Sequence, residues 1–214
     1  MRKCLALIGL LLFPAVATAE VPGTKELTPQ IGWQYGGTQE YVTYLGYPAG
    51  DFHSNANLNY GGTFSIFLKP VYAAEISYSY QSTDLIVRPN GQRDQKVGTL
   101  ASQYIQLQGT RVIPVKPGKT DFLGFGGLGA TVFSAQGYNS HWLFSVSGGI
   151  GVKVHMNERT SLRLQTRLLL PIQWASSGFY FGTGGSGVTV GGGSSIIQGD
   201  VSLGLTMKLG SQRQ

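Results

Sequence analysis

The chain has 214 residues, which allows one domain or at most two small ones. Only 12% of the residues are charged, and no apolar run reaches the roughly 18 residues of a membrane-spanning helix, so the composition excludes both a disordered chain and a helical membrane protein. With 32 glycines, 11 tyrosines and 10 phenylalanines, the sequence favours an all-β protein over a helical bundle.

Residues 1–19 are predicted to form a secretory signal peptide. Arg2 and Lys3 form a positively charged N-terminal region, residues 5–13 are apolar, and residues 17–19 form a small-residue cleavage site. Cleavage would leave residues 20–214 as the barrel domain and would remove Cys4, the single cysteine, which excludes disulfides and thiolate chemistry. The remaining net charge of +4 is too small for the basic patch of a nucleic-acid-binding protein.

Eight segments alternate apolar and polar residues with the two-residue period of a β-strand. In chain order these are residues 28–41, 58–68, 71–81, 104–112, 120–135, 141–155, 160–174 and 197–209. In the fourth segment, Arg111 breaks the alternation unless Gly109 forms a β-bulge. Glycines gather in the fifth and sixth segments. They could make room for large neighbours inside the sheet, but we favour relief of sheet curvature.

The connections between these segments alternate in length. Short turns are predicted at residues 69–70, 114–119 and 156–159, and longer loops at residues 42–57, 82–99, 136–140 and 175–195. Short turns at one end and long loops at the other are typical of barrels that cross an outer membrane. The predicted fold class is therefore all-β, an eight-stranded antiparallel up-and-down transmembrane β-barrel.

Two groups of residues indicate which face of the strands meets lipid. Aromatic residues of the apolar parity near predicted strand ends are typical of the girdles at membrane interfaces: Trp33, Tyr35, Tyr72, Tyr80, Trp142 and Trp174. Charged residues of both signs occupy the polar parity deep within strands: Glu75, Lys153, Arg163, Arg167 and Asp200. A basic residue facing hydrocarbon at the midplane would cost about 2–4 kcal/mol, whereas opposite charges can pair in a filled interior.

We therefore expect the six aromatic residues to face lipid and the five charged residues to form an ionic core that closes the lumen. Arg167 and Asp200 are predicted to lie at similar heights on adjacent strands. Glu75 is expected lower in the barrel, near the levels of Arg163 and Lys153. Loss of one partner from such a buried pair would cost about 3–5 kcal/mol.

The signal, the eight alternating strands and the amphipathic last strand with Ser202, Gly204, Met207 and Leu209 resemble the small outer-membrane β-barrel superfamily, which includes the OmpA transmembrane domain and OmpX. The resemblance covers residues 20–209, but the chain ends with residues 210–214 in place of the usual terminal phenylalanine. It implies a monomer in the bacterial outer membrane, in contact with lipid and lipopolysaccharide and inserted by the barrel-assembly machinery. The implied role is non-enzymatic: envelope structure, or surface interaction through the loops.

Candidate chemistry is limited to Ser140, His141 and Ser145, where a serine and a histidine could act together. The histidine-x-serine pattern of lipid A deacylases is absent, because Leu143 occupies its third position. His53, His141 and His155 fall on different elements, so no metal site is predicted. We expect no catalytic residue and no cofactor. Two alternatives stay open: a lipid-modifying barrel enzyme that depends on His141, and a soluble periplasmic lipocalin-like carrier.

Overall fold

The computed structural model describes ten stretches of the chain: residues 20–36, 38–42, 48–54, 56–89, 95–116, 119–135, 140–172, 180–181, 188–189 and 197–210. Within these stretches every regular element is a β-strand. A search of the same stretches finds no helix with the length and apolar character needed to cross a membrane. The predicted signal peptide, with Cys4, and Trp174 lie outside the described residues.

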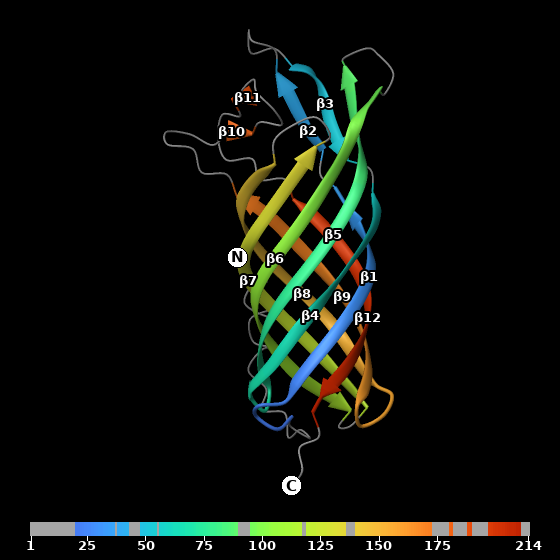
Figure 1. Cartoon of the computed structure of the whole chain (residues 1–214), viewed down its shortest axis with the longest axis vertical. Helices are drawn as coiled ribbons and strands as arrows, with labels where there is room; N and C mark the ends of the chain where they lie inside the picture. Colours follow the sequence, from blue (N-terminus) through green and yellow to red (C-terminus); the bar gives the residue numbers. More distant parts are fainter. Residues whose placement is uncertain are drawn as a thin grey trace, which may run out of the picture.

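Eight strands form a closed ring (Figure 1). They are β1 (Lys25–Tyr35), β4 (Asn57–Lys69), β5 (Tyr72–Pro89), β6 (Gln95–Lys116), β7 (Thr120–Ala135), β8 (His141–His155), β9 (Thr160–Ile172) and β12 (Gln198–Leu209). Each pairs antiparallel with the next in the chain, and β1 pairs with both β4 and β12, so the sheet closes on itself. The predicted all-β, eight-stranded antiparallel up-and-down barrel is confirmed.

Four shorter strands lie at one end of the ring (Figure 1). β2 (Thr38–Val42) pairs with β3 (Pro48–Ser54), and β3 pairs with the far part of β5. β10 (Tyr180–Phe181) pairs with β11 (Val188–Thr189). We call this the loop end. The short connections β4–β5, β6–β7 and β8–β9 lie at the opposite end, which we call the turn end.

Several predicted boundaries are wrong at the loop end. The first predicted strand, residues 28–41, is divided between β1 and β2, and β1 begins earlier, at Lys25. The predicted loops at residues 42–57 and 82–99 contain β3 and the ends of β5 and β6. Residues 85–87 are Leu-Ile-Val, a sequence with high β-propensity, and they pair with both β3 and β6 beyond the ring.

The structure has no bulge at Gly109, so the break in the alternation at Arg111 has another cause. The register of β6 with both neighbours continues through Gly109, and the register shifts of β6 lie between Lys96 and Gly98 and between Pro114 and Lys116. Arg111 simply occupies the outward parity at the turn end. There its guanidinium lies over the Tyr72 ring, 5.8 Å from the ring centroid. A half-buried basic residue needs no bulge at this position, because it lies at the rim of the barrel, where its charge can reach beyond the apolar surface.

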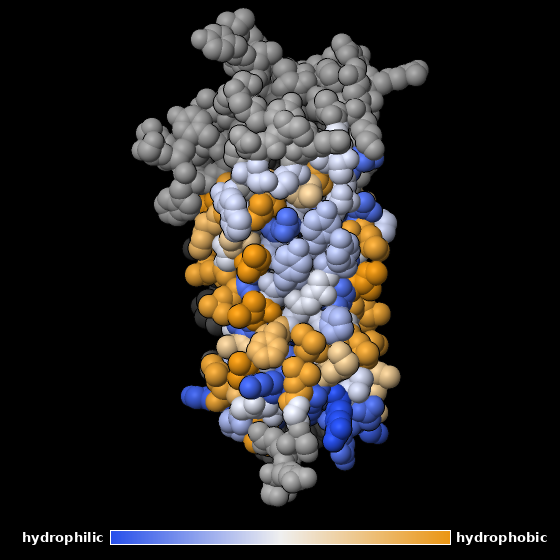
Figure 2. Space-filling view, in the orientation of Figure 1, coloured by the Kyte–Doolittle hydropathy of each residue, from blue (hydrophilic) through white to orange (hydrophobic). Residues whose placement is uncertain are grey.

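The polarity of the barrel is the reverse of that of a water-soluble domain. Large apolar side chains such as Ile31, Leu128, Leu164 and Leu203 are exposed on the outer surface, whereas most of the buried side chains are polar or charged. Figure 2 shows the hydrophobic residues as a band along both flanks of the barrel. Two apolar clusters close the interior, one near the turn end and one near the loop end: Phe67, Ala73, Val112, Leu123 and Phe125, and then Leu100, Tyr104, Phe133 and Leu169.

Candidate functional site in the barrel interior

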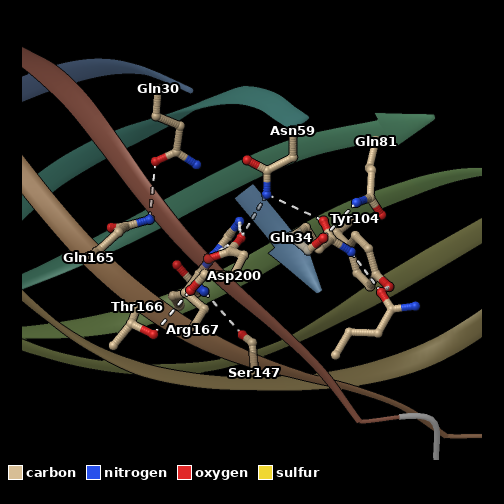
Figure 3. A network of polar contacts seen from close by, with 12 residues as sticks. Gln30, Gln34, Asn59, Gln81, Tyr104, Ser147, Gln165, Thr166, Arg167 and Asp200 are labelled. Atoms are coloured by element: carbon tan, nitrogen blue, oxygen red, sulfur yellow. Dashed lines mark hydrogen bonds and ion pairs between the residues drawn. The ribbon is translucent and has the colours of Figure 1, made fainter. Parts of the chain in front are cut away.

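Arg167 and Asp200 form an ion pair between neighbouring strands. They are register partners on β9 and β12, so both side chains point into the barrel. The Arg167 Nε lies 3.1 and 3.0 Å from the two Asp200 carboxylate oxygens, and Nη2 donates a further hydrogen bond to Asp200 Oδ2. Asn59 Nδ2 donates to the same oxygen at 3.2 Å (Figure 3). Both charged residues are only 1% exposed, so the pair depends on these contacts for its solvation.

Arg163 and Glu75 form a second ion pair that crosses the lumen. Arg163 Nη1 and Nη2 lie 2.9 and 3.1 Å from Glu75 Oε1 and Oε2, a bidentate geometry that gives strong charge-assisted hydrogen bonds. Ser65 Oγ donates to Glu75 Oε1 at 2.9 Å. The guanidinium also lies 5.6 Å from the centroid of the Phe125 ring. The pair therefore connects β9 to β5 through the centre of the barrel.

Lys153 pairs with a residue that the sequence analysis missed. Its Nζ lies 2.6 and 2.8 Å from the two carboxylate oxygens of Glu26. The sequence pattern predicted only that Lys153 lies near the level of Glu75 and named no separate partner for it. Glu26 lies on β1, before the start of the predicted first strand. A usable signal was present, because Glu26 shares the inward parity of Thr28 and Gln30. Extending the alternation back by two residues would have placed it inside the barrel.

Three polar side chains meet at the turn end. His155 Nε2 lies 2.7 Å from Asp121 Oδ2, and His155 Nδ1 lies 2.9 Å from Ser161 Oγ. These residues come from β7, β8 and β9, so their contact could not be predicted from the alternation within any one strand. The combination is that of a serine-hydrolase triad, but Ser161 is only 2% exposed, which closes its hydroxyl to substrate. We interpret the cluster as a structural hydrogen-bond chain.

An amide network fills the barrel near the loop end. Gln34 Nε2 donates to Gln198 Oε1 at 2.7 Å, and the Tyr104 hydroxyl donates to the same oxygen. Gln81 Nε2 donates to the backbone oxygen of Gln34 at 2.9 Å (Figure 3). Because β6 and β12 lie on opposite sides of the ring, the contact between Tyr104 and Gln198 spans the lumen at a second height.

Inward-facing glycines on β7 make room for glutamine side chains. Gln106 and Gln108 on β6 reach past β7 to β8, where they donate to Ser145 and Ser147 at 2.6 and 3.0 Å. A Cβ on Gly129 would lie 2.8 Å from Gln106 Cδ, and one on Gly127 would lie 2.7 Å from Gln108 Cγ. The nearest atoms to the two Cβ positions are the backbone oxygens of Ile105 and Leu107, at 2.0 and 2.1 Å, so a side chain here would meet the neighbouring strand as well as the glutamines.

The predicted aromatic residues are placed as follows. Trp33, Tyr35, Tyr72 and Trp142 are exposed on the outer surface of the barrel. Tyr80 is half-buried and lies within β5, because that strand runs on to Pro89. Two further tyrosines on the same surface, Tyr60 and Tyr78, are exposed as well.

Of the candidate catalytic residues, the side chains of Ser140 and Ser145 are described, and they have separate partners. Ser140 Oγ lies 2.8 Å from Ser134 Oγ, and Ser145 is fully buried as an acceptor for Gln106. The side chains of His53 and His141 are outside the described part of the chain. A search of the described residues finds no group of three histidine, cysteine or acidic side chains that could hold a metal ion.

Known proteins resemble this chain in structure and not in sequence. No family model and no curated protein matches the sequence. The outer membrane protein OprG from Pseudomonas aeruginosa superposes with a TM-score of 0.64 at 12% identity, over 91% of this chain and 100% of that one. Neisserial surface protein A gives 0.53 at 10% identity, over 86% and 97% of the two chains. The outer membrane protein AlkL, solved in lipid bilayers, gives 0.53 at 11% identity, over 94% and 97%.

These comparisons agree with the closed ring of eight strands and with the resemblance drawn from the sequence. The chain has the fold of the small eight-stranded outer-membrane β-barrels.

Proposed function

We propose that this protein is a non-enzymatic β-barrel of the bacterial outer membrane, with its loop end outside the cell and a lumen closed by its own side chains. The observation that carries the proposal is the reversed polarity of the barrel. Three charged pairs are buried in the interior, while leucines and isoleucines cover the outside. So large an exposed apolar surface is unfavourable in water and suits acyl chains.

The dimensions of the ring support a membrane location. A transmembrane strand needs about 9–11 tilted residues, and the shortest strand of the ring, β1, has 11. In a closed antiparallel ring each strand pairs on both sides, which satisfies backbone N–H and C=O groups where lipid offers no hydrogen bonds.

Two contacts across the lumen favour a closed interior over a pore. Glu75 with Arg163 and Tyr104 with Gln198 join opposite strands of the ring at two heights. An eight-stranded barrel is just wide enough for side chains to fill it. We therefore assign the internal charges a structural role, and place the function either in envelope integrity or in contacts of the loop end with molecules at the cell surface.

Lipid and lipopolysaccharide are the expected surroundings, and insertion as a monomer through the barrel-assembly machinery is the expected route. Cell fractionation followed by electrophoresis tests the proposal. We expect the protein in the outer-membrane fraction, with a faster-migrating folded band in cold dodecyl sulfate that shifts after boiling to the position of the unfolded mature chain, below the 22.9 kDa of the full sequence. Recovery in the soluble periplasmic fraction without detergent would favour the lipocalin-like carrier instead.

The enzymatic alternative has a separate test. If the barrel modified membrane lipid, replacement of His141 by alanine would abolish a lipid product that mass spectrometry detects in cells with the unaltered protein. We expect identical lipid profiles for cells with the unaltered protein, with the His141→Ala variant and without the gene.

A further inference from the structure

A polar pocket lies where the sheet is interrupted at the loop end. Its volume is about 400 Å³, and it is lined by Ala56, Asn57, Ser82, Thr83, Asp84 and Thr99. β5 pairs with β4 as far as Gln81 and with β3 from Leu85, so residues 82–84 fall between the two partners. Side chains hold this gap in shape: Asn57 Nδ2 donates to the Ser82 backbone oxygen at 2.6 Å, and Gln81 Nε2 donates to the Asn57 backbone oxygen at 3.1 Å.

The lining has the chemistry of a site for a polyhydroxyl ligand. Ser82 and Thr99 contribute hydroxyls, groups that both donate and accept hydrogen bonds. The Thr83 side chain is buried, and the Asn57 amide is bonded to the backbone of Ser82 and Leu58, so these two residues shape the wall of the pocket. Asp84 adds a carboxylate, and the described lining residues include no basic side chain. A phosphate would find no cation among them, and an acyl chain would find little apolar surface. A saccharide, whose hydroxyls are donors and acceptors, matches this lining.

A group of tyrosines continues the pocket along the outer surface. We call Tyr60, Tyr78, Tyr80 and Gln103 the tyrosine patch. The rings of Tyr60 and Tyr80 lie 5.2 Å apart at 43°, and the Tyr78 hydroxyl donates to Gln103 Oε1 at 3.3 Å. Tyr80 and Ser82 have the same outward parity on β5, so the patch begins next to the pocket and extends toward the turn end.

The tyrosine patch differs from the rest of the outer surface. Figure 2 shows a pale strip of intermediate hydropathy between the orange flanks, over the strands that face the viewer in Figure 1. The outward positions of β9 and β12 are mostly aliphatic, as at Leu164 and Leu203, and include no tyrosine. A tyrosine offers an apolar ring face together with a polar hydroxyl, which suits contacts to a sugar ring and to the first carbons of an acyl chain.

We infer that the pocket and the tyrosine patch form one binding site for a membrane-anchored glycolipid, with the saccharide in the pocket and its lipid portion along the tyrosines. The inference rests on the proposed function, because the loop end must face the outer leaflet. The pocket chemistry alone would serve a soluble sugar equally well. The pocket is continuous with the tyrosine patch, which extends into the apolar band. This continuity favours a ligand that is anchored in the membrane.

Binding to three probes tests the inference. Full-length mature protein in phospholipid nanodiscs is titrated with lipopolysaccharide whose core oligosaccharide carries no phosphate, with lipid A that lacks this core, and with the free core oligosaccharide. We expect the complete glycolipid to bind at least tenfold more tightly than either part. Equal affinity for lipid A would overturn the role of the saccharide, and equal affinity for the free oligosaccharide would overturn the membrane anchor.

Two variants locate the site. Thr99→Phe fills the pocket and Tyr80→Leu removes a ring of the tyrosine patch while keeping the surface apolar. Each should weaken glycolipid binding about tenfold. Thr120→Phe places the same ring on the outward parity of β7 at the turn end and should leave the affinity unchanged. Resistance of each variant to cold dodecyl sulfate reports folding separately. Folded variants that keep full affinity would overturn the inference and leave the proposed function intact.

Discussion

The carboxylate of Glu75 and the guanidinium of Arg163 meet inside the barrel although their strands lie opposite each other in the ring. Between β5 and β9 stand β6, β7 and β8 on one side and β4, β1 and β12 on the other. No contact between neighbouring strands could place these two groups together. The pair is therefore a brace across the lumen, and its formation requires that the ring has closed.

Removal of the Glu75 charge should destabilise the barrel strongly. In Glu75→Leu the Arg163 guanidinium stays buried without its partner, and the expected loss is about 3–5 kcal/mol of unfolding free energy. The double variant Glu75→Leu with Arg163→Leu should recover most of this loss, because no unpaired charge remains. Urea unfolding in lipid vesicles, followed by tryptophan fluorescence, measures both. A single variant as stable as the unaltered protein would contradict the role of the brace.

Burial should separate two lysine–glutamate pairs that have the same length. Lys153 with Glu26 and Lys208 with Glu20 both have an N–O distance of 2.6 Å, but the side chains are 3% and 5% exposed in the first pair and 26% and 15% in the second. Lys153→Met should cost about 3–5 kcal/mol and Lys208→Met about 0–1 kcal/mol. Similar midpoints of urea unfolding for the two variants would show that the internal pair adds nothing beyond a surface pair.

Two glycines of β7 offer a matched test of the packed interior. A Cβ on Gly129 would lie 2.0 Å from the backbone oxygen of Ile105 and 2.8 Å from Gln106 Cδ, whereas a Cβ on Gly124 has no neighbour within 4 Å. Gly129→Ala should therefore destabilise the barrel by about 1–3 kcal/mol through overpacking, and Gly124→Ala should be close to neutral. Thermal unfolding by circular dichroism measures the difference. Equal behaviour of the two variants would favour curvature relief as the common role of these glycines.

Asp200 and Leu203 compare the interior with the outer surface on one strand. Asp200→Asn weakens the pair with Arg167, and Leu203→Asn puts an amide on the apolar surface. We expect both variants to lower the midpoint of thermal unfolding. In Asp200→Asn the buried Arg167 guanidinium keeps only a neutral partner, and in Leu203→Asn the outer surface loses apolar contact with lipid. If Asp200→Asn left the midpoint of thermal unfolding unchanged while Leu203→Asn lowered it strongly, only the outer surface would matter for stability.

The strand pattern was predictable because the membrane-spanning part of each strand keeps the two-residue period. The same pattern predicted that Arg167 and Asp200 lie at similar heights on adjacent strands, because the order and direction of neighbouring strands determine the relative heights of their residues. The partner of Lys153 was not predictable in this way. It depends on where β1 begins and on the register with which β1 closes the ring against β12, and neither follows from the alternation within a strand.

The loop end was predicted less well for a related reason. Beyond the apolar band no lipid imposes a period, so β3 and the far parts of β5 and β6 lack the alternating signature. The contacts of Asp121, His155 and Ser161 escaped notice because each residue lies near the end of a different strand. Only the joint register of three strands brings them together.

Spin labels at neighbouring positions test the central claim, that the apolar parity faces lipid and the polar parity is enclosed. Because Cys4 lies in the predicted signal peptide, single cysteines can be introduced at Leu203 and Ser202 without a background thiol. In vesicles, a label at position 203 should be relaxed by oxygen dissolved in the bilayer and not by a water-soluble nickel complex, and one at position 202 should be shielded from both. Access of the nickel complex to position 203, with oxygen contact at position 202, would contradict the account.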